Sequence, residues 1–131
     1  MNNLKYFRTI ANLTRKELSS LMNVTVYTYQ GYEDDRMVMR PETVILVSMI
    51  YNIDKNDIFC PENDVSEDTL EKLNKLAVMQ EKERYNQLIY NLTGDKKDKI
   101  GYKQVNMIIK EIRTKLQNGC LENQVTKVFL H

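Results

Sequence analysis

Residues 14–33 have the sequence TRKELSSLMNVTVYTYQGYE, and this stretch decides the fold. Thr14 can accept a hydrogen bond from the backbone N–H of Glu17, while the Glu17 side chain can accept one from the N–H of Thr14. These reciprocal bonds predict a helix that begins at Thr14. Apolar residues then follow at helical spacing on one face, namely Leu18, Leu21 and Met22.

A second short helix is expected directly after a turn. Asn23 marks the turn because asparagine tolerates left-handed backbone better than most residues, and Thr25 offers the next N-terminal cap. Tyr29 and Tyr32 lie three positions apart and give this helix a buried side. Its outward side then carries Val26, Tyr27, Thr28, Gln30 and Gly31. Two short helices joined by a tight turn are one means of placing a helix in the DNA major groove.

The pattern continues on both sides of this stretch. We expect one helix over residues 4–12, another over residues 41–52 with Pro41 in its first turn, and a short fifth segment ending at Phe59. The positions that fit a known pattern are Leu4, Phe7-Arg8, Leu13-Thr14, Glu17-Leu18-Ser19, Asn23-Val24-Thr25, Tyr29, Tyr32-Glu33, Glu42-Thr43-Val44, Val47-Ser48, Tyr51-Asn52-Ile53 and Asp57-Ile58-Phe59. In these positions, over residues 3–59, the chain resembles the phage-repressor helix-turn-helix family of the Xre/Cro type.

The resemblance implies a five-helix DNA-binding domain. It also implies an internal ion pair between Arg8 and Glu33 that braces the first helix against the third, the recognition helix. The chain departs from the family pattern in having Arg15 in place of Gln, Asn23 in place of Gly, and Asp34-Asp35 in place of Asn-Gly. The first departure favours a phosphate contact over a base contact.

The DNA contacts are expected from the outward side of the third helix and from its surroundings. Gln pairs well with adenine and Val can meet a thymine methyl group, so an A·T-leaning half-site is expected. The predicted base contacts are Val26, Tyr27, Thr28, Gln30 and Gly31. The predicted phosphate contacts are Thr14, Arg15, Lys16, Thr25, Arg36 and Arg40.

Three of these residues have alternative explanations. Tyr27 could be an idle surface aromatic, and Arg40 could equally cover the start of the fourth helix. Gly31 in mid-helix costs about 1 kcal/mol relative to Ala. It either permits close approach to DNA or has no particular role.

The composition indicates that any function that depends on charge relies on local clusters of charged residues. The chain has 131 residues, with 19 basic and 18 acidic side chains and a formal net charge of +1, so it is not a bulk polycation. The first sixteen residues contain four basic side chains and no acidic ones, whereas residues 33–35 are three consecutive carboxylates. The start of the second helix is therefore the expected phosphate anchor.

No set of residues suggests catalysis, a metal or a cofactor. Cys60 and Cys120 lack the spacing of metal ligands, and His131 is the one histidine. The longest apolar run, residues 44–47, is far too short to span a membrane, and no signal peptide is evident. We therefore expect a cytoplasmic protein that is not an enzyme, has no cofactor or metal, and does not associate with a membrane.

The fold class predicted for the whole chain is all-α, with a boundary near residue 62. Pro61 disfavours helical backbone at Cys60, which separates a domain at 1–62 from a helical region at 63–131. The second region should have two to three helices, with residues 66–92 forming one long helix or two shorter ones. Its apolar stripes could pack on the first domain or pair with a second copy. The predicted dimerisation residues are Leu70, Leu73, Leu88, Val105, Ile108, Ile109, Ile112 and Leu116.

Three functions remain open at this point. The leading one is a transcriptional regulator, a homodimeric repressor that binds double-stranded DNA at a near-palindromic operator with half-sites roughly 34 Å apart. The second is the antitoxin of a toxin–antitoxin pair, whose C-terminal helices bind a partner protein or peptide. The third is a protein-binding module that has lost DNA affinity.

Overall fold

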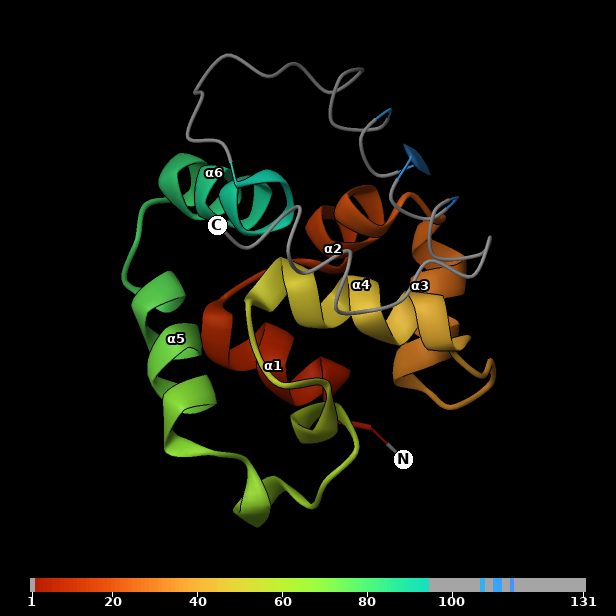
Figure 1. Cartoon of the computed structure of the whole chain (residues 1–131), viewed down its shortest axis with the longest axis horizontal. Helices are drawn as coiled ribbons and strands as arrows, with labels where there is room; N and C mark the ends of the chain where they lie inside the picture. Colours follow the sequence, from red (N-terminus) through yellow and green to blue (C-terminus); the bar gives the residue numbers. More distant parts are fainter. Residues whose placement is uncertain (1, 95–106, 108–109, 112–113, 115–131) are drawn as a thin grey trace.

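The computed structural model of the chain describes residues 2–94, 107, 110–111 and 114, and every regular element in that part of the chain is a helix (Figure 1). The elements are α1 (Leu4–Ala11), α2 (Arg15–Met22), α3 (Val26–Glu33), α4 (Pro41–Tyr51), the 3-10 helices η1 (Lys55–Ile58) and η2 (Glu62–Asp64), α5 (Glu67–Ala77) and α6 (Glu81–Thr93). The predicted all-α class is confirmed for the described residues. No helix among them is long and apolar enough to cross a membrane.

The predicted caps of α2 and α3 are present. The N–H of Glu17 donates to Thr14 Oγ1 at 3.1 Å, and the N–H of Thr14 donates to Glu17 Oε1 at 3.0 Å. Asn23 ends α2 in the left-handed conformation with a φ of 55°. Thr25 caps α3 by accepting the N–H of Thr28 at 3.1 Å. The boundaries of both helices thus follow from local hydrogen bonding that the sequence specifies.

The core is built around α4, which lies between the other helices (Figure 1). Pro41 occupies its first turn, where a missing N–H removes no intrahelical bond. On α4, Val47, Ser48 and Tyr51 are buried, while Val44 is half-buried. Phe7 of α1 packs its ring edge-on against Tyr51, with the ring centroids 5.9 Å apart. Burying aromatic and aliphatic side chains of this kind supplies the main driving force for folding.

The boundary expected near residue 62 does not divide two cores. Residues 66–92 form two helices, with α5 packed against α1 and α6 packed against α4. Leu73 and Leu88 are fully buried in the same cluster as Leu4 and Ile50. The apolar stripes of α5 and α6 therefore complete the core of the first five helices.

This packing corrects part of the predicted dimer surface. Leu73 and Leu88 face the interior of their own chain, so neither is available to a second copy. Leu70 is half-buried at the surface of α5. The remaining predicted dimerisation residues, Val105, Ile108, Ile109, Ile112 and Leu116, lie outside the described residues.

Two buried polar side chains tie the later helices to the earlier ones. The Asp57 carboxylate accepts the hydroxyls of Ser66 at 2.8 Å and Thr69 at 2.6 Å, which fixes the start of α5 against η1. The buried guanidinium of Arg84 in α6 donates to four backbone carbonyls. They belong to Leu76 at 2.8 Å, Ala77 at 3.3 Å, Met79 at 2.7 Å and Asn12 at 2.9 Å. Arg84 thus satisfies carbonyls at the C-terminal ends of both α5 and α1.

Candidate nucleic-acid interface

The first part of α3 projects side chains away from the core. Val26 is 43% exposed and Tyr27 is 66% exposed, whereas Tyr29 is fully buried. Thr28 and Gln30 are half-buried, and the Thr28 hydroxyl lies 3.0 Å from that of Thr25. The predicted outward side is thus present for four of its five residues.

Gly31 is the exception, and its prediction as a base contact is wrong. It is buried, and its carbonyl accepts the N–H of Arg36 at 2.9 Å and that of Met37 at 3.1 Å. A Cβ atom at this position would lie 3.0 Å from the Met37 Cγ and 3.1 Å from its Sδ. Glycine therefore lets the loop after α3 fold closely against the helix. The glycine faces its own chain, so it makes room for Met37 and not for a ligand.

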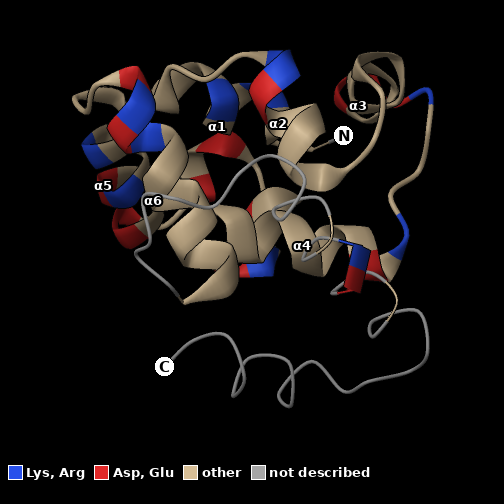
Figure 2. Ribbon diagram, turned by 90° about the horizontal axis from the view of Figure 1, so that it is seen from above, with Lys and Arg blue, Asp and Glu red and all other residues tan. Residues whose placement is uncertain are grey.

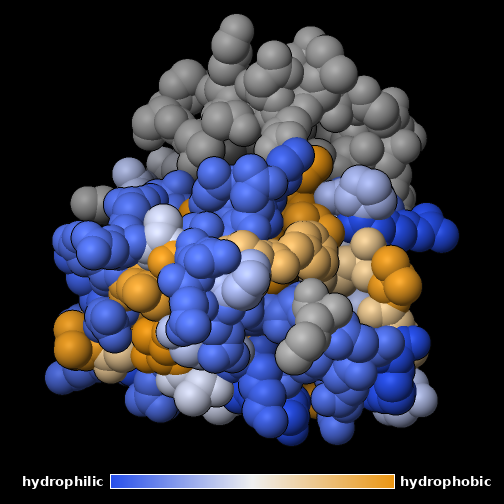
Figure 3. Space-filling model, turned by 90° about the horizontal axis from the view of Figure 1, so that it is seen from below, coloured by the Kyte–Doolittle hydropathy of each residue, from blue (hydrophilic) through white to orange (hydrophobic). Residues whose placement is uncertain are grey.

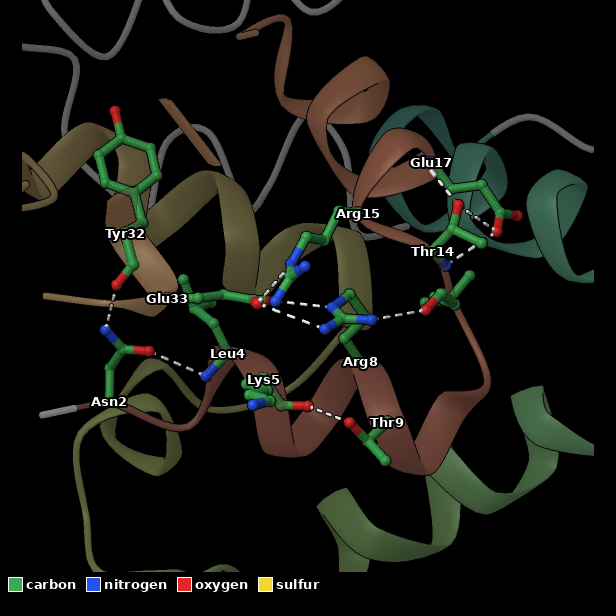
Figure 4. Close-up of polar contacts among 11 residues, drawn as sticks. Asn2, Leu4, Lys5, Arg8, Thr9, Thr14, Arg15, Glu17, Tyr32 and Glu33 are labelled. Carbon is green, nitrogen blue, oxygen red and sulfur yellow. Dashed lines mark hydrogen bonds and ion pairs between the residues drawn. The ribbon is translucent and has the colours of Figure 1, made fainter. Parts of the chain in front are cut away.

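A buried ion cluster fixes α3 against α1 and α2 (Figure 4). Arg8 Nε lies 2.7 Å from Glu33 Oε2, and Arg15 Nε lies 3.1 Å from Glu33 Oε1. The Glu33 side chain is fully buried, and Arg8 also donates to the carbonyl of Leu13 at 3.2 Å. The ion pair between Arg8 and Glu33 that the resemblance implied is confirmed. Arg15, which was expected to contact phosphate, joins the cluster through its Nε, while its side chain stays 38% exposed.

The protonation of this cluster follows from its hydrogen bonds. Burial alone would raise the pKa of Glu33, but Arg8, Tyr29 and Arg15 together outweigh burial and place that pKa below its ordinary value. The hydrogen bond to Glu33 raises the pKa of Arg8 despite partial desolvation. Burial raises the pKa of Tyr29, so this neighbouring phenol stays neutral. Glu33 therefore remains ionised and Arg8 remains protonated near neutral pH.

The three consecutive carboxylates at residues 33–35 do not form one bare acidic patch. Glu33 is buried between two arginines, and Asp34 lies 3.9 Å from Arg36. Asp35 has a φ of 60° and accepts the Asn2 amide at 3.3 Å. Only two of these carboxylates reach the surface, and each has a polar or basic neighbour.

The loop from α3 to α4 supplies basic side chains beside the exposed part of α3. Figure 2 shows that α3 has no basic residues and that blue residues lie along the chain that follows it. Arg40 is 78% exposed and lies 3.9 Å from Glu42. The guanidinium carbon of Arg36 lies 4.6 Å from the centre of the Tyr27 ring. This stacked pair could not be predicted from the sequence. Tyr27 and Arg36 are nine residues apart, and the sequence does not indicate that the loop turns back over the helix.

The start of α2 lies beside the start of α6. Thr14 and Lys16 are exposed there, as the phosphate prediction requires. A broad groove of about 1040 Å³ separates the two helix starts, and its lining residues are Thr14, Lys16, Glu17, Ser20, Gln80, Glu81, Lys82, Tyr85 and Asn86. Two lysines and two glutamates line the groove, so the lining as a whole carries no net charge.

The remaining surface offers fewer candidate sites. On the face drawn in Figure 3, hydrophilic residues cover most of the described surface and hydrophobic residues form smaller patches between them. Within the described residues, no group of three or more His, Cys, Asp or Glu side chains could hold a metal ion. The outward part of α3, with the loop that follows it, is therefore the best-defined candidate interface. Comparison with family models, curated proteins and solved structures found no match to this chain.

Proposed function

We propose that this protein is a sequence-specific DNA-binding transcriptional regulator that inserts the exposed side of α3 into the major groove. The observation that carries the proposal is the α2–turn–α3 unit, in which Val26 and Tyr27 project outward from a helix anchored through buried Tyr29 and Glu33. An eight-residue helix is about 12 Å long, and a helix with its side chains matches the width of the major groove.

Anchoring by three contacts keeps the reading surface rigid. Arg8 and Arg15 hold the end of α3 through Glu33, and the Asn2 amide donates to the carbonyl of Tyr32 at 2.8 Å. Base recognition depends on side chains that are held in place before binding, because less conformational freedom is then lost. The ion cluster thus supports recognition without touching DNA.

Phosphate contacts are assigned to residues that border α3. Thr14 and Lys16 at the start of α2, Thr25 at the start of α3, and Arg40 at the end of the loop are exposed. Backbone contacts of this kind fix the position of a protein on the duplex, while base contacts select the sequence. With a net charge of only +1, the chain depends on such local contacts.

A homodimer on a near-palindromic operator is part of the proposal, with repression through promoter occupancy as its effect. One short reading helix makes few base contacts, and a symmetric pair of helices reads two half-sites together. Because Leu73 and Leu88 are internal, the contact between copies must use other residues. Leu70 and the 85% exposed Val78 lie together on a shallow part of the α5 surface and are the described candidates.

A protein-binding module is the second candidate function. It is favoured by the absence of Lys or Arg from α3 itself, where the exposed residues are Val26 and Tyr27. Salt dependence separates the two candidates. For a DNA binder, the logarithm of the binding constant falls linearly with the logarithm of the salt concentration, with a slope of about −0.9 for each phosphate neutralised.

The experiment that tests the proposal is selection of bound duplexes from a random pool, with the oligomeric state measured in the same buffer. We expect a two-fold symmetric site bound by a dimer. The matched control is Glu62→Gln, which removes an exposed charge on η2, outside α3, the loop after it and the α5 surface around Leu70 and Val78. Enrichment of no sequence, with weak binding that is independent of salt, would reject the proposal in favour of the protein-binding module.

A further inference from the structure

Tyr27 and Arg36 form a stacked pair that, among the described residues, holds a basic group against the exposed side of α3. The guanidinium carbon lies 4.6 Å from the ring centre, within the range of an attractive cation–π contact. Tyr27 belongs to the first turn of α3, and its ring is 66% exposed. The contact therefore places a cation against Tyr27, one of the residues assigned to base contacts.

Stacking leaves the hydrogen-bonding capacity of an arginine intact. A guanidinium stacks through its face, whereas its five N–H donors point outward in its plane. The Arg36 side chain is 40% exposed, and its nearest carboxylate oxygen, in Asp34, is 3.9 Å away, too far for a hydrogen bond. The donor edge of Arg36 is consequently accessible to a ligand that approaches α3.

The other arginines near this surface differ from Arg36. Arg15 donates its Nε to the buried Glu33 at 3.1 Å, which turns this side chain toward the ion cluster. Arg40 is 78% exposed and its nearest acidic neighbour, Glu42, lies 3.9 Å away, which suits a mobile contact to phosphate. Arg36 differs from both because its donors are accessible while its guanidinium contacts an aromatic ring.

We propose that Arg36, held in place by the Tyr27 ring, reads a guanine in the operator half-site. Two parallel N–H donors match the O6 and N7 acceptors of guanine in the major groove, which is the most frequent specific contact between a side chain and a base. Tyr27 acts as the positioning residue of this contact. The inference rests on the proposed DNA-binding function and adds one G·C pair to the A·T-leaning half-site predicted from Gln30 and Val26.

The test compares full-length variants on the selected duplex and on duplexes carrying single G·C to A·T changes, all at one salt concentration. Wild type should bind the selected duplex about 10-fold or more tightly than the duplex changed at the guanine read by Arg36. Arg36→Lys keeps the charge but loses the fork, so it should lose most of this discrimination and keep its affinity for non-specific DNA. Tyr27→Ala should reduce the same discrimination between G·C and A·T. Tyr27→Phe, which keeps the ring, should discriminate as well as wild type.

The outcomes separate this inference from the proposed function. Arg40→Lys should affect all duplexes alike, and Glu62→Gln, on the exposed surface of η2, should match wild type. If Arg36→Ala weakens every duplex equally and lowers the salt slope by about 0.9, Arg36 contacts phosphate and the inference is wrong while DNA binding stands. If no G·C change affects wild-type binding to the selected duplex, the inference is also wrong. If wild type selects no duplex, the proposed function itself fails.

Discussion

Arg8 Nε lies 2.7 Å from Glu33 Oε2, and this contact joins the first helix to the last turn of α3. Because the Glu33 side chain is fully buried, the contact is also the point at which α3 is most sensitive to a single substitution. The orientation of the candidate reading helix is thus set at its C-terminal end, where Glu33 meets Arg8 and Arg15 (Figure 4). The exposed Val26 and Tyr27 lie at the start of the helix.

Glu33→Gln should destabilise the fold strongly. The amide leaves Arg8 and Arg15 without a counter-ion, and breaking a buried pair costs about 3–5 kcal/mol. The free energy of unfolding is measured by urea denaturation. Asp34→Asn, the same chemical change at a carboxyl that is 44% exposed, is the control and should cost less than about 0.5 kcal/mol. Equal stability of the two variants would contradict the structural role of Glu33.

The stability of the wild type should fall in acid in a way that depends on Glu33. The pKa of this carboxyl is lowered in the folded state from an ordinary value of 4.5. Its stabilising contribution is therefore fully present above that value and is lost as pH falls through the lower folded pKa. Urea denaturation between about pH 6 and pH 3 should show that the free energy of unfolding falls less steeply with decreasing pH for Glu33→Gln than for wild type. Parallel pH profiles for the two proteins would contradict the assignment.

Gly31→Ala should change stability little and DNA preference not at all. Alanine favours the helix by about 1 kcal/mol, and displacing the flexible Met37 side chain offsets this gain. Gly31→Val adds a branched side chain at the same crowded point and should be clearly less stable in thermal denaturation. A changed operator preference in Gly31→Ala would indicate that the residue meets DNA after all.

Arg84→Met should destabilise the fold by about 3 kcal/mol, because buried carbonyls at the ends of α5 and α1 lose their donors. Arg84→Lys should rescue little, since one ammonium cannot replace a planar fork that serves four carbonyls. Lys82→Met, on the exposed side of α6, is the matched control and should be near neutral. A stable Arg84→Met protein would show that α6 is held by its apolar contacts alone.

Truncation after Asn63 should abolish cooperative folding. Residues 64–94 include Leu73 and Leu88, which are fully buried against the earlier helices, so their removal exposes the core. Thermal unfolding followed by circular dichroism should lose its sharp transition. A truncated chain with a sharp transition would mean that the first five helices are an independent domain, as the boundary near residue 62 implied.

Local features of this fold could be predicted from the sequence, because nearby residues determine them. The capping pair Thr14 and Glu17, the left-handed Asn23 and the cap at Thr25 all depend on hydrogen bonds within three to five residues. The Arg8–Glu33 pair was expected only because the chain resembles a family.

Features that depend on tertiary packing could not be predicted. The periodicity of α5 and α6 shows that each has an apolar face, but it does not identify what covers that face. The stack of Arg36 on Tyr27 and the approach of Met37 to Gly31 both depend on the path of the loop after α3. Nothing in the sequence around Arg84 distinguishes it from a surface arginine. Its carbonyl partners are brought together only because the C-terminal ends of α5 and α1 lie close to each other in the fold.

The central claim is that the outward side of α3 reads DNA. The most direct test is to determine the sequences of the duplexes that wild type and Gln30→Ala each select from a random pool. We predict that both proteins enrich a related symmetric site and that the Gln30→Ala site differs at one or two positions in each half. Identical sites for the two proteins, or no enriched site for wild type, would contradict the claim.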